Sequence, residues 1–346
     1  MSGSDEYGEV VCTIGVFDGM HAGHRFLLSA AQEEADLLGL PLLVVTFQSD
    51  PEELFKPAGQ CLKLLSNAER LQRLADVEDA AAEGEVTGAG AAGEGTAPDG
   101  APEGADRVSP DVTLRRQVLA LPFTAELAAT DPTDFLNQVL ARHCTPASIH
   151  VGSNFRFGQA ARGDVNLLRR WAATQNPPAQ VHEHRLIDSN GLPVSASLIR
   201  SLLQDARLQE ANQLLTRPHH LHGQIVRGRG FGKEIGFPTA NISVLGGSMQ
   251  PADGVYAGYF ELSGEMHAAA ISVGVPLTFE GLEASLEVYV LDYEANLYDR
   301  EATIWFLEYL RPMIAFANTT ELMEQISRDV TRTREIASHP IPSFWA

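Results

Sequence analysis

The first half of the sequence alternates short apolar runs with amphipathic segments, and this alternation restricts the fold more than any other feature. A buried strand is expected at 9–17, an amphipathic helix at 24–40 that ends near Gly39, and a second buried strand at 41–47. The alternation resumes between residues 115 and 187. Because strands joined by crossover helices pair in parallel, the sequence predicts an α/β domain: a parallel sheet with helices on both faces.

The pattern changes after a helical pair at 194–218. Between residues 222 and 310 the apolar segments become short and alternating, and Gly or Asp turns separate them. This spacing is typical of an antiparallel barrel or sandwich, and we expect a small β-barrel. A C-terminal helix at 318–337, capped by Asn318 or Thr319, follows the barrel.

A chain of 346 residues is long for one domain. We therefore predict an N-terminal domain at 1–203, a helical linker at 204–218 and a C-terminal domain at 219–346. Residues 76–106 carry nine acidic residues, seven glycines and no basic residue. Such a segment buries too little apolar surface to offset its ordering entropy, so a disordered acidic insertion is expected at about 76–108.

Composition excludes several classes of protein. The net charge of −20 argues against a broad nucleic-acid interface, which needs a basic face. The sequence has no apolar run long enough to span a membrane and no secretory signal pattern, so no membrane association is expected. The three cysteines are scattered, which favours reduced thiols in the cytoplasm. The sequence does not indicate an oligomeric state.

His21 and His24 follow the first strand and lie three residues apart at the start of a helix. Gly15, Gly19 and Gly23 permit a tight turn in which the backbone approaches a ligand closely. Both imidazoles could then point at one phosphate group near the positive end of the helix dipole. A metal site and a purely structural role are the alternatives, although the metal site lacks a convincing third and fourth ligand.

The stretch G-x-F-D-G-x-H-x-G-H at 15–24 resembles the signature of HxGH nucleotidyltransferases, in particular the adenylyltransferase domain of bacterial FAD synthetases. That resemblance implies a Rossmann-like domain that transfers AMP from ATP to FMN and releases pyrophosphate. It gives His21 and His24 a catalytic role on the ATP phosphates. It also places Gly15, Phe17, Asp18 and Gly23 in the nucleotide site.

Two later blocks in this half match the same family. "VGSNFRFGQAARGD" at 151–164 implies ligand contacts from Asn154 and Arg156. "VSASLIRSLL" at 194–203 resembles a phosphate-binding helix start, with Ser195 and Ser197 as helix caps and Arg200 as a clamp on ATP phosphates. Each of these residues could also be purely structural. Position 50 departs from the family, because it holds Asp where a second-strand His is usual.

The stretch "RGRGFGKEIGFPTANI" at 227–242 is the strongest motif of the second half. Its glycines suit a loop that covers phosphates, and Thr239 and Asn241 offer oxygen ligands for a hard cation such as Mg2+. The stretch resembles the G-F-P-T-A-N motif of riboflavin kinases; a glycine-rich hairpin is the alternative. The resemblance implies ATP and flavin contacts, and the expected ligand-binding residues are Gly232, Lys233, Gly236, Pro238 and Arg311.

In riboflavin kinases, a glutamate on a later strand accepts the proton of the riboflavin 5′-hydroxyl. By position, the resemblance assigns this role to Glu287, which strand alternation places on the same side as Ser285 and Tyr289. A solvated strand glutamate is the alternative. Pro276 and Asp299 stand where the family commonly has Asn and Gly.

Together the two halves resemble a bifunctional riboflavin kinase and FAD synthetase. Riboflavin, FMN, FAD and ATP are the expected ligands, and Mg2+ is the expected cation. Two alternatives stay open: a chain that retains only FAD synthetase activity, and a protein that binds flavin nucleotides without turnover.

Overall fold

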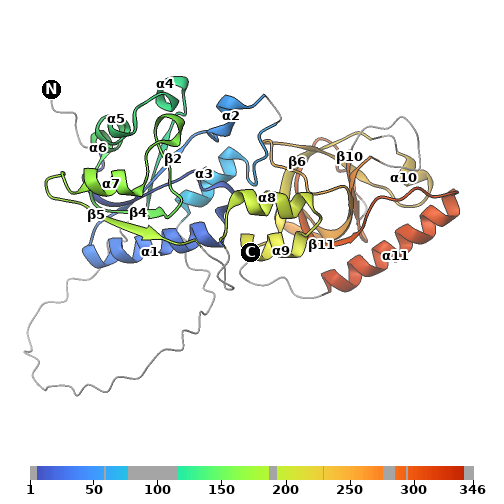
Figure 1. The fold of residues 1–346 in the computed structure, drawn as a ribbon. Coiled ribbons are helices and arrows are strands. Elements are labelled where there is room, and N and C mark those ends of the chain that lie inside the picture. The colour runs from blue at the N-terminus through green and yellow to red at the C-terminus, as the bar shows by residue number, and fades with distance from the viewer. Residues whose placement is uncertain are drawn as a thin grey trace, which may run out of the picture.

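The computed structural model describes residues 6–57, 60–76, 116–186, 193–228, 230–275, 285–293 and 295–338. Figure 1 shows an α/β body beside a β-barrel, with two helices between them. Apart from Asp76, the expected acidic insertion at 76–108 lies outside the described residues, and so does Pro276.

The α/β body is built on a five-stranded parallel sheet in the order β3-β2-β1-β4-β5. The chain runs outward from β1 to β3 and then returns to the other side of β1 with β4 and β5. This reversal makes the carboxyl ends of β1 and β4 a topological switch point, where ligands of open α/β sheets bind. The strands are β1 (Glu9–Ile14), β2 (Leu42–Phe47), β3 (Gln117–Leu121), β4 (Thr145–Gly152) and β5 (Gln180–His184).

Helices cover both faces of this sheet, which confirms the sequence prediction. On one face, α1 (Ala22–Leu38) and α3 (Asn67–Ala75) bury apolar side chains against Val11, Leu42 and Val44. On the other face, the helical segments η3 (Phe135–Leu140) and α7 (Val165–Ala172) pack on the opposite side chains of the same strands. Strands that are buried on both faces need continuous apolar runs, and β1 and β2 have them.

Helix α1 begins at Ala22, two residues earlier than expected, because His21 caps its N-terminus. It ends as predicted at Gly39, which adopts the left-handed conformation with φ of 66°.

The second body is a closed antiparallel barrel in the order β10-β7-β6-β11-β8-β9, so the barrel alternative was correct and the sandwich was not. Gly258 allows β8 to approach β11, since a Cβ atom there would lie 1.9 Å from the carbonyl oxygen of Trp305. The strands are β6 (His219–Val226), β7 (Ala240–Val244), β8 (Gly254–Leu262), β9 (Glu265–Gly274), β10 (Ser285–Val290) and β11 (Glu301–Arg311).

The C-terminal helix α11 (Thr319–Ala337) packs against β8 and β9 on the outside of the barrel. Of the two expected caps, Asn318 is the one used: its side chain accepts a hydrogen bond from the backbone N–H of Glu321 at 2.9 Å.

Helices α8 (Ala196–Gln204) and α9 (Leu208–Leu215) lie between the two bodies (Figure 1). Their apolar faces belong to the same buried cluster as the barrel interior. Asn212 of α9 donates to the carbonyl of Phe306 at 2.9 Å and accepts from the N–H of His219 at 2.7 Å, which fastens α9 to the barrel. The remaining short helical segments are η1 (Asp18–Met20), α2 (Glu52–Phe55), α4 (Ala125–Ala128), α5 (Pro132–Asp134), α6 (Ala141–His143), η4 (Gln159–Ala161) and α10 (Phe231–Glu234).

Candidate functional sites

The two histidines of the first motif lie at the switch point, directly after β1. Their rings stack with centroids 3.6 Å apart, and Nδ1 of His21 accepts the backbone N–H of His24 at 3.3 Å. Nδ1 of His24 is buried and makes no hydrogen bond within the described part of the chain. The two rings therefore lie against each other at the start of α1.

Both imidazoles are neutral at physiological pH. Burial and the nearby Arg217 cation lower the pKa of His21 to about 4. Burial and His21 hold the pKa of His24 well below its usual value. Because Nδ1 of neutral His21 accepts a hydrogen bond, its proton resides on Nε2 and can be donated to a ligand.

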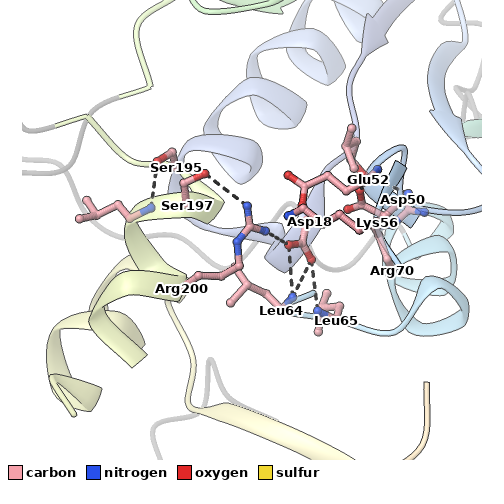
Figure 2. Close-up of polar contacts among 12 residues, drawn as sticks. Asp18, Asp50, Glu52, Lys56, Leu64, Leu65, Arg70, Ser195, Ser197 and Arg200 are labelled. Carbon is pink, nitrogen blue, oxygen red and sulfur yellow. Dashed lines mark hydrogen bonds and ion pairs between the residues drawn. The ribbon is translucent and has the colours of Figure 1, made fainter. Parts of the chain in front are cut away.

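Asp18 and Arg200 form an ion pair beside the histidines. In Figure 2 the Asp18 carboxylate accepts a hydrogen bond from Nη1 of Arg200 at 2.8 Å. It also accepts hydrogen bonds from the backbone N–H groups of Leu64 and Leu65. Burial raises the pKa of Asp18, whereas Arg200 and the N–H of Leu64 lower it. Two residues that the motif assigned to the nucleotide thus contact each other, and Asp18 serves to hold Arg200 in place.

The start of α8 carries the two serines of the second block. Ser195 caps the helix by accepting the N–H of Leu198 at 3.2 Å. Ser197 was also expected to be a cap, but it lies within the first turn, where its hydroxyl accepts from Nη2 of Arg200 at 3.3 Å (Figure 2). The helix begins at Ala196, so only Ser195 stands at the capping position.

Phe17 and Gly23 shape the turn that carries the histidines. The Phe17 side chain is 1% exposed and its ring meets His24 edge-on at 5.2 Å, although its backbone is left-handed with φ of 60°. A Cβ atom at Gly23 would lie 2.9 Å from Leu186 and 3.3 Å from the His21 ring. Phe17 therefore supports the turn from within the core, and glycine at position 23 leaves room for His21.

An apolar pocket of about 450 Å³ opens at the carboxyl edge of the sheet. Gly15 and Arg156, two of the residues expected to contact ligands, line it, whereas Asn154 is exposed and lies outside its lining. The aromatic wall was not predicted as a unit, because its members come from segments that are far apart in the sequence; they are Phe47, Phe55, Phe123, Phe135, Phe155 and Phe157.

Arg70 is a supporting residue that sequence reasoning missed. Its guanidinium is buried and donates to the carbonyls of Val16 and Phe47 at 2.9 and 2.7 Å and to Oγ1 of Thr46 at 2.9 Å. These contacts join the loop after β1 to the end of β2. No local pattern marks such a residue, because its partners lie far away in the sequence.

The second site lies on the barrel, where β7 and β10 pair. Glu287 and Asn241 are direct partners in the two strands, and Oγ1 of Thr239 donates to Oε2 of Glu287 at 3.0 Å. Ser285 donates to the other carboxylate oxygen of Glu287 at 3.3 Å. Buried residues alternate with half-buried ones along β10, so Glu287 shares its side with Ser285 and Tyr289 as predicted.

The glycine-rich loop folds back over this second site. The carbonyl of Gly232 accepts the N–H of Phe237 at 2.7 Å, and a Cβ atom at Gly232 would lie 3.3 Å from Oγ1 of Thr239. Gly236 has a φ of 84°, while Lys233 and Pro238 are exposed at the surface of the loop.

Arg311 forms an ion pair with Asp329 of the same chain. Its Nη2 and Nε atoms donate to the buried carboxylate of Asp329 at 2.8 and 3.0 Å, and the guanidinium lies 5.8 Å from the Phe316 ring. This pair therefore joins the end of β11 to helix α11.

Comparisons with known proteins agree with both halves of the chain. The FAD synthetase family pattern matches residues 4–80 and 115–198, and the riboflavin kinase pattern matches residues 215–337. A bifunctional riboflavin kinase/FMN adenylyltransferase of Pseudomonas fluorescens is 31% identical over 96% of this chain and 94% of its own length. The chain belongs to this bifunctional family.

Other members are similar over nearly the whole chain. The Escherichia coli (strain K12) protein of the same name is 31% identical over 94% of this chain and 92% of its own. A crystal structure of a protein named macrolide-efflux protein, from Streptococcus pneumoniae, superposes on this chain with a TM-score of 0.75, at 26% identity and 94% coverage of both chains.

In the described ranges of this chain, no helix is long and apolar enough to cross a membrane.

Two departures from the family's usual motifs can be placed in the structure. Asp50 is 7% exposed and accepts the N–H of Glu52 at 2.8 Å, so it shapes the turn after β2 (Figure 2). Asp299 has a φ of 64°, a left-handed conformation that explains why glycine is usual there.

Proposed function

We propose that this chain makes FAD from riboflavin in two steps, one on each body. The barrel phosphorylates riboflavin with ATP to give FMN, and the α/β body transfers AMP from a second ATP to FMN, releasing pyrophosphate. The observation that carries the proposal is that a single chain, similar over 96% of its length to a bifunctional relative, assembles both motif clusters.

In the adenylyl-transfer step, we assign the phosphate contacts to His21, His24 and Arg200. A neutral imidazole donates N–H to a phosphate oxygen, and its contact strengthens as charge grows on the oxygens around phosphorus. Nδ1 of His24, to which no described residue forms a hydrogen bond, is a polar atom that a ligand would satisfy. Arg200, anchored by Asp18, keeps further N–H groups that can bind phosphate.

The apolar pocket is the proposed site of the flavin ring in this step. Its aromatic wall suits a flat, conjugated ring, and Gly15 and Arg156 lie on its lining next to the end of β1. Binding there would orient the FMN phosphate toward the histidines. Orientation and charge stabilisation account for the step without a covalent enzyme intermediate.

In the kinase step, Glu287 is the proposed base that accepts the proton of the riboflavin 5′-hydroxyl. The hydroxyl of Thr239 and the amide oxygen of Asn241 are hard oxygen donors beside Glu287, so this donor set fits Mg2+. Mg2+ bound there would neutralise charge on the ATP phosphates. The loop with Gly232, Lys233, Gly236 and Pro238 is assigned to cover those phosphates, and Arg311 to order the flavin side.

We propose the domain boundaries at 1–203, 204–218 and 219–346. The Asp18–Arg200 pair supports assigning the start of α8 to the first domain, and the bonds of Asn212 tie α9 to the barrel. The three cysteines are free thiols, which suits a reducing compartment, and we propose the cytoplasm.

One assay tests both activities. The protein is incubated with riboflavin, ATP and Mg2+, and riboflavin, FMN and FAD are separated by chromatography; both products are expected. FMN without FAD would contradict the synthetase, and FAD from supplied FMN with none from riboflavin would contradict the kinase. If neither product formed, the chain would be a flavin-nucleotide binding protein.

A further inference from the structure

A second cluster of histidines lies on the face of the sheet that α1 covers, away from both proposed catalytic sites. It consists of Glu34 on α1, His150 on β4, and His182 and His184 on β5. We propose that Glu34, His150 and His182 bind one divalent transition-metal cation, with Zn2+ as the preferred ion.

The parallel register of the sheet brings these side chains together. His150 pairs directly with His182 across β4 and β5, so both side chains project from the same face. Helix α1 packs on β4 (Figure 1). Its Glu34 side chain contacts both imidazole rings. Three elements that are far apart in sequence therefore each contribute one ligand atom.

The ligand atoms already converge. Oε2 of Glu34 lies 2.7 Å from Nε2 of His150 and 3.1 Å from Nε2 of His182, and the three ligand atoms all lie within 4.8 Å of one another. In a tetrahedral zinc site with bonds of about 2.0–2.2 Å, ligand atoms are roughly 3.3 Å apart. Side-chain adjustments of less than about an ångström would open the cluster around a cation.

One ligand atom of the cluster lacks a hydrogen bond. Nε2 of His182 is buried and forms no hydrogen bond to any described residue; its contact is the 3.1 Å ion-pair distance to Oε2 of Glu34. Burying a ring nitrogen without a hydrogen bond costs free energy, and a cation between the imidazole and the carboxylate would offset that cost. The side chain of His182 is 37% exposed and that of Glu34 is 23% exposed, so an ion can enter from solvent.

The donor set selects the kind of cation. Two imidazoles and one carboxylate suit zinc and its neighbours in the transition series, whereas Mg2+ prefers an octahedron of oxygens. Three protein ligands leave a further position for water. His184 completes the arrangement from outside, since its Nε2 lies 3.1 Å from Nδ1 of His150 and can accept that N–H, as outer residues do around metal-bound histidines.

The cluster is separate from the nucleotide site. Glu34 lies ten residues after His24 on α1, which corresponds to roughly 15 Å along the helix axis. A cation there would fasten α1 to β4 and β5 without contact to the phosphate-binding histidines. The competing explanation is a network of His–Glu hydrogen bonds that holds the same elements without a metal.

Zinc titration of the full-length chain without an affinity tag distinguishes these explanations. Protein dialysed against a chelator is titrated with Zn2+ in competition with a metal-sensitive dye, and Co2+ is added separately for its visible absorption. We expect one equivalent of tightly bound Zn2+ and a higher melting temperature in its presence. Affinity should fall at least tenfold in His182→Ala and in Glu34→Gln, and roughly 10- to 100-fold in His184→Ala.

His143→Ala is the matched control, because His143 also pairs with a glutamate at the surface: its Nδ1 lies 3.2 Å from Oε2 of Glu6. It should bind zinc as the unchanged chain does, and His182→Ala should still convert FMN to FAD. The proposal is overturned if no equivalent of zinc binds, or if His182→Ala and Glu34→Gln bind it as tightly as His143→Ala.

Discussion

The Asp18 carboxylate and the Arg200 guanidinium meet at 2.8 Å although 182 residues separate them in the chain. Backbone N–H groups of Leu64 and Leu65 hold the other side of the carboxylate, so Asp18 is fixed before any ligand arrives. The pair therefore sets where the Arg200 guanidinium stands relative to the stacked histidines. Positioning of this kind contributes to catalysis because the charge needs no reorganisation during the reaction.

Replacing Arg200 by glutamine should separate the two activities. In Arg200→Gln, FMN-to-FAD conversion is expected to fall at least 100-fold, since both the phosphate contact and the partner of Asp18 are lost. The free energy of unfolding should decrease by about 1–3 kcal/mol, because Asp18 keeps only its backbone donors. Riboflavin phosphorylation, measured in the same preparation, should stay within twofold.

Arg207→Gln is the control for this substitution. Arg207 precedes the first residue of α9 and pairs with Glu210 at the surface, and an exposed pair of this kind contributes little. A loss of FAD synthesis in Arg207→Gln as large as that in Arg200→Gln would argue against a specific role for Arg200.

Removing the charge of Asp50 should strengthen ATP binding. Its carboxylate is close enough to Asp18 to raise the pKa of that residue, so it adds negative potential where phosphates are proposed to bind. Asn at position 50 keeps an oxygen that can accept the N–H of Glu52. In Asp50→Asn the KM for ATP in FAD synthesis should fall roughly 2- to 10-fold.

The KM for ATP is measured by steady-state kinetics in Asp50→Asn and in the control variant Asp36→Asn. Asp36 is a suitable control because it is exposed on α1 in the same body. Equal KM values in the two variants would show that the Asp50 charge does not reach the nucleotide.

The architecture and the motifs could be predicted from the sequence, but contacts between residues that are far apart in the chain could not. Apolar periodicity predicted the parallel sheet and the barrel, because the pattern of apolar residues within a strand indicates which of its faces are buried. Arg70 and Glu34 were missed because each acts on residues brought near only by folding.

Glu287→Gln should stop riboflavin phosphorylation and spare FAD synthesis. Glutamine keeps the size of the side chain and an oxygen for Thr239 to donate to, but it cannot accept the hydroxyl proton. The rate of FMN formation is expected to fall by about 100- to 10,000-fold. FAD formation from supplied FMN should remain within twofold of the unchanged chain.

Glu301→Gln serves as the control, since Glu301 is an exposed glutamate on β11 of the same barrel, paired with His222. If Glu287→Gln phosphorylated riboflavin as fast as Glu301→Gln, Glu287 would not be the base.

Buried histidines should make the chain sensitive to acid. Burial and the neighbouring His220 lower the pKa of His219 to about 3, and burial lowers that of His21 to about 4. At pH values between these pKa values and the usual histidine pKa of about 6.5, both histidines are protonated in the unfolded chain but stay neutral in the folded chain. Stability is therefore complete above about pH 6.5 and is lost as the pH falls, approaching about 1.4 kcal/mol per pH unit for each histidine.

The Glu69–His220 contact between the two bodies adds to this loss at lower pH. Burial opposes the charged form of Glu69, but His220 and Arg73 together hold the pKa of its carboxyl well below the usual range. A carboxylate with a lowered pKa stabilises the folded chain above its unfolded pKa of about 4.3, and this contribution disappears on further acidification. Acid unfolding should accordingly steepen below about pH 4.5.

Urea unfolding of His219→Gln, measured from pH 7.5 to 5.0, isolates one of these contributions. The amide of glutamine can replace Nε2 of His219 as donor to the carbonyl of Met249, but it takes up no proton. The decline in unfolding free energy over this range should be about 1–2 kcal/mol smaller than in the unchanged chain. His222→Gln, which changes a half-buried histidine of the same strand, is the comparison. If the two variants showed equal slopes, the acid sensitivity would not arise from the burial of His219.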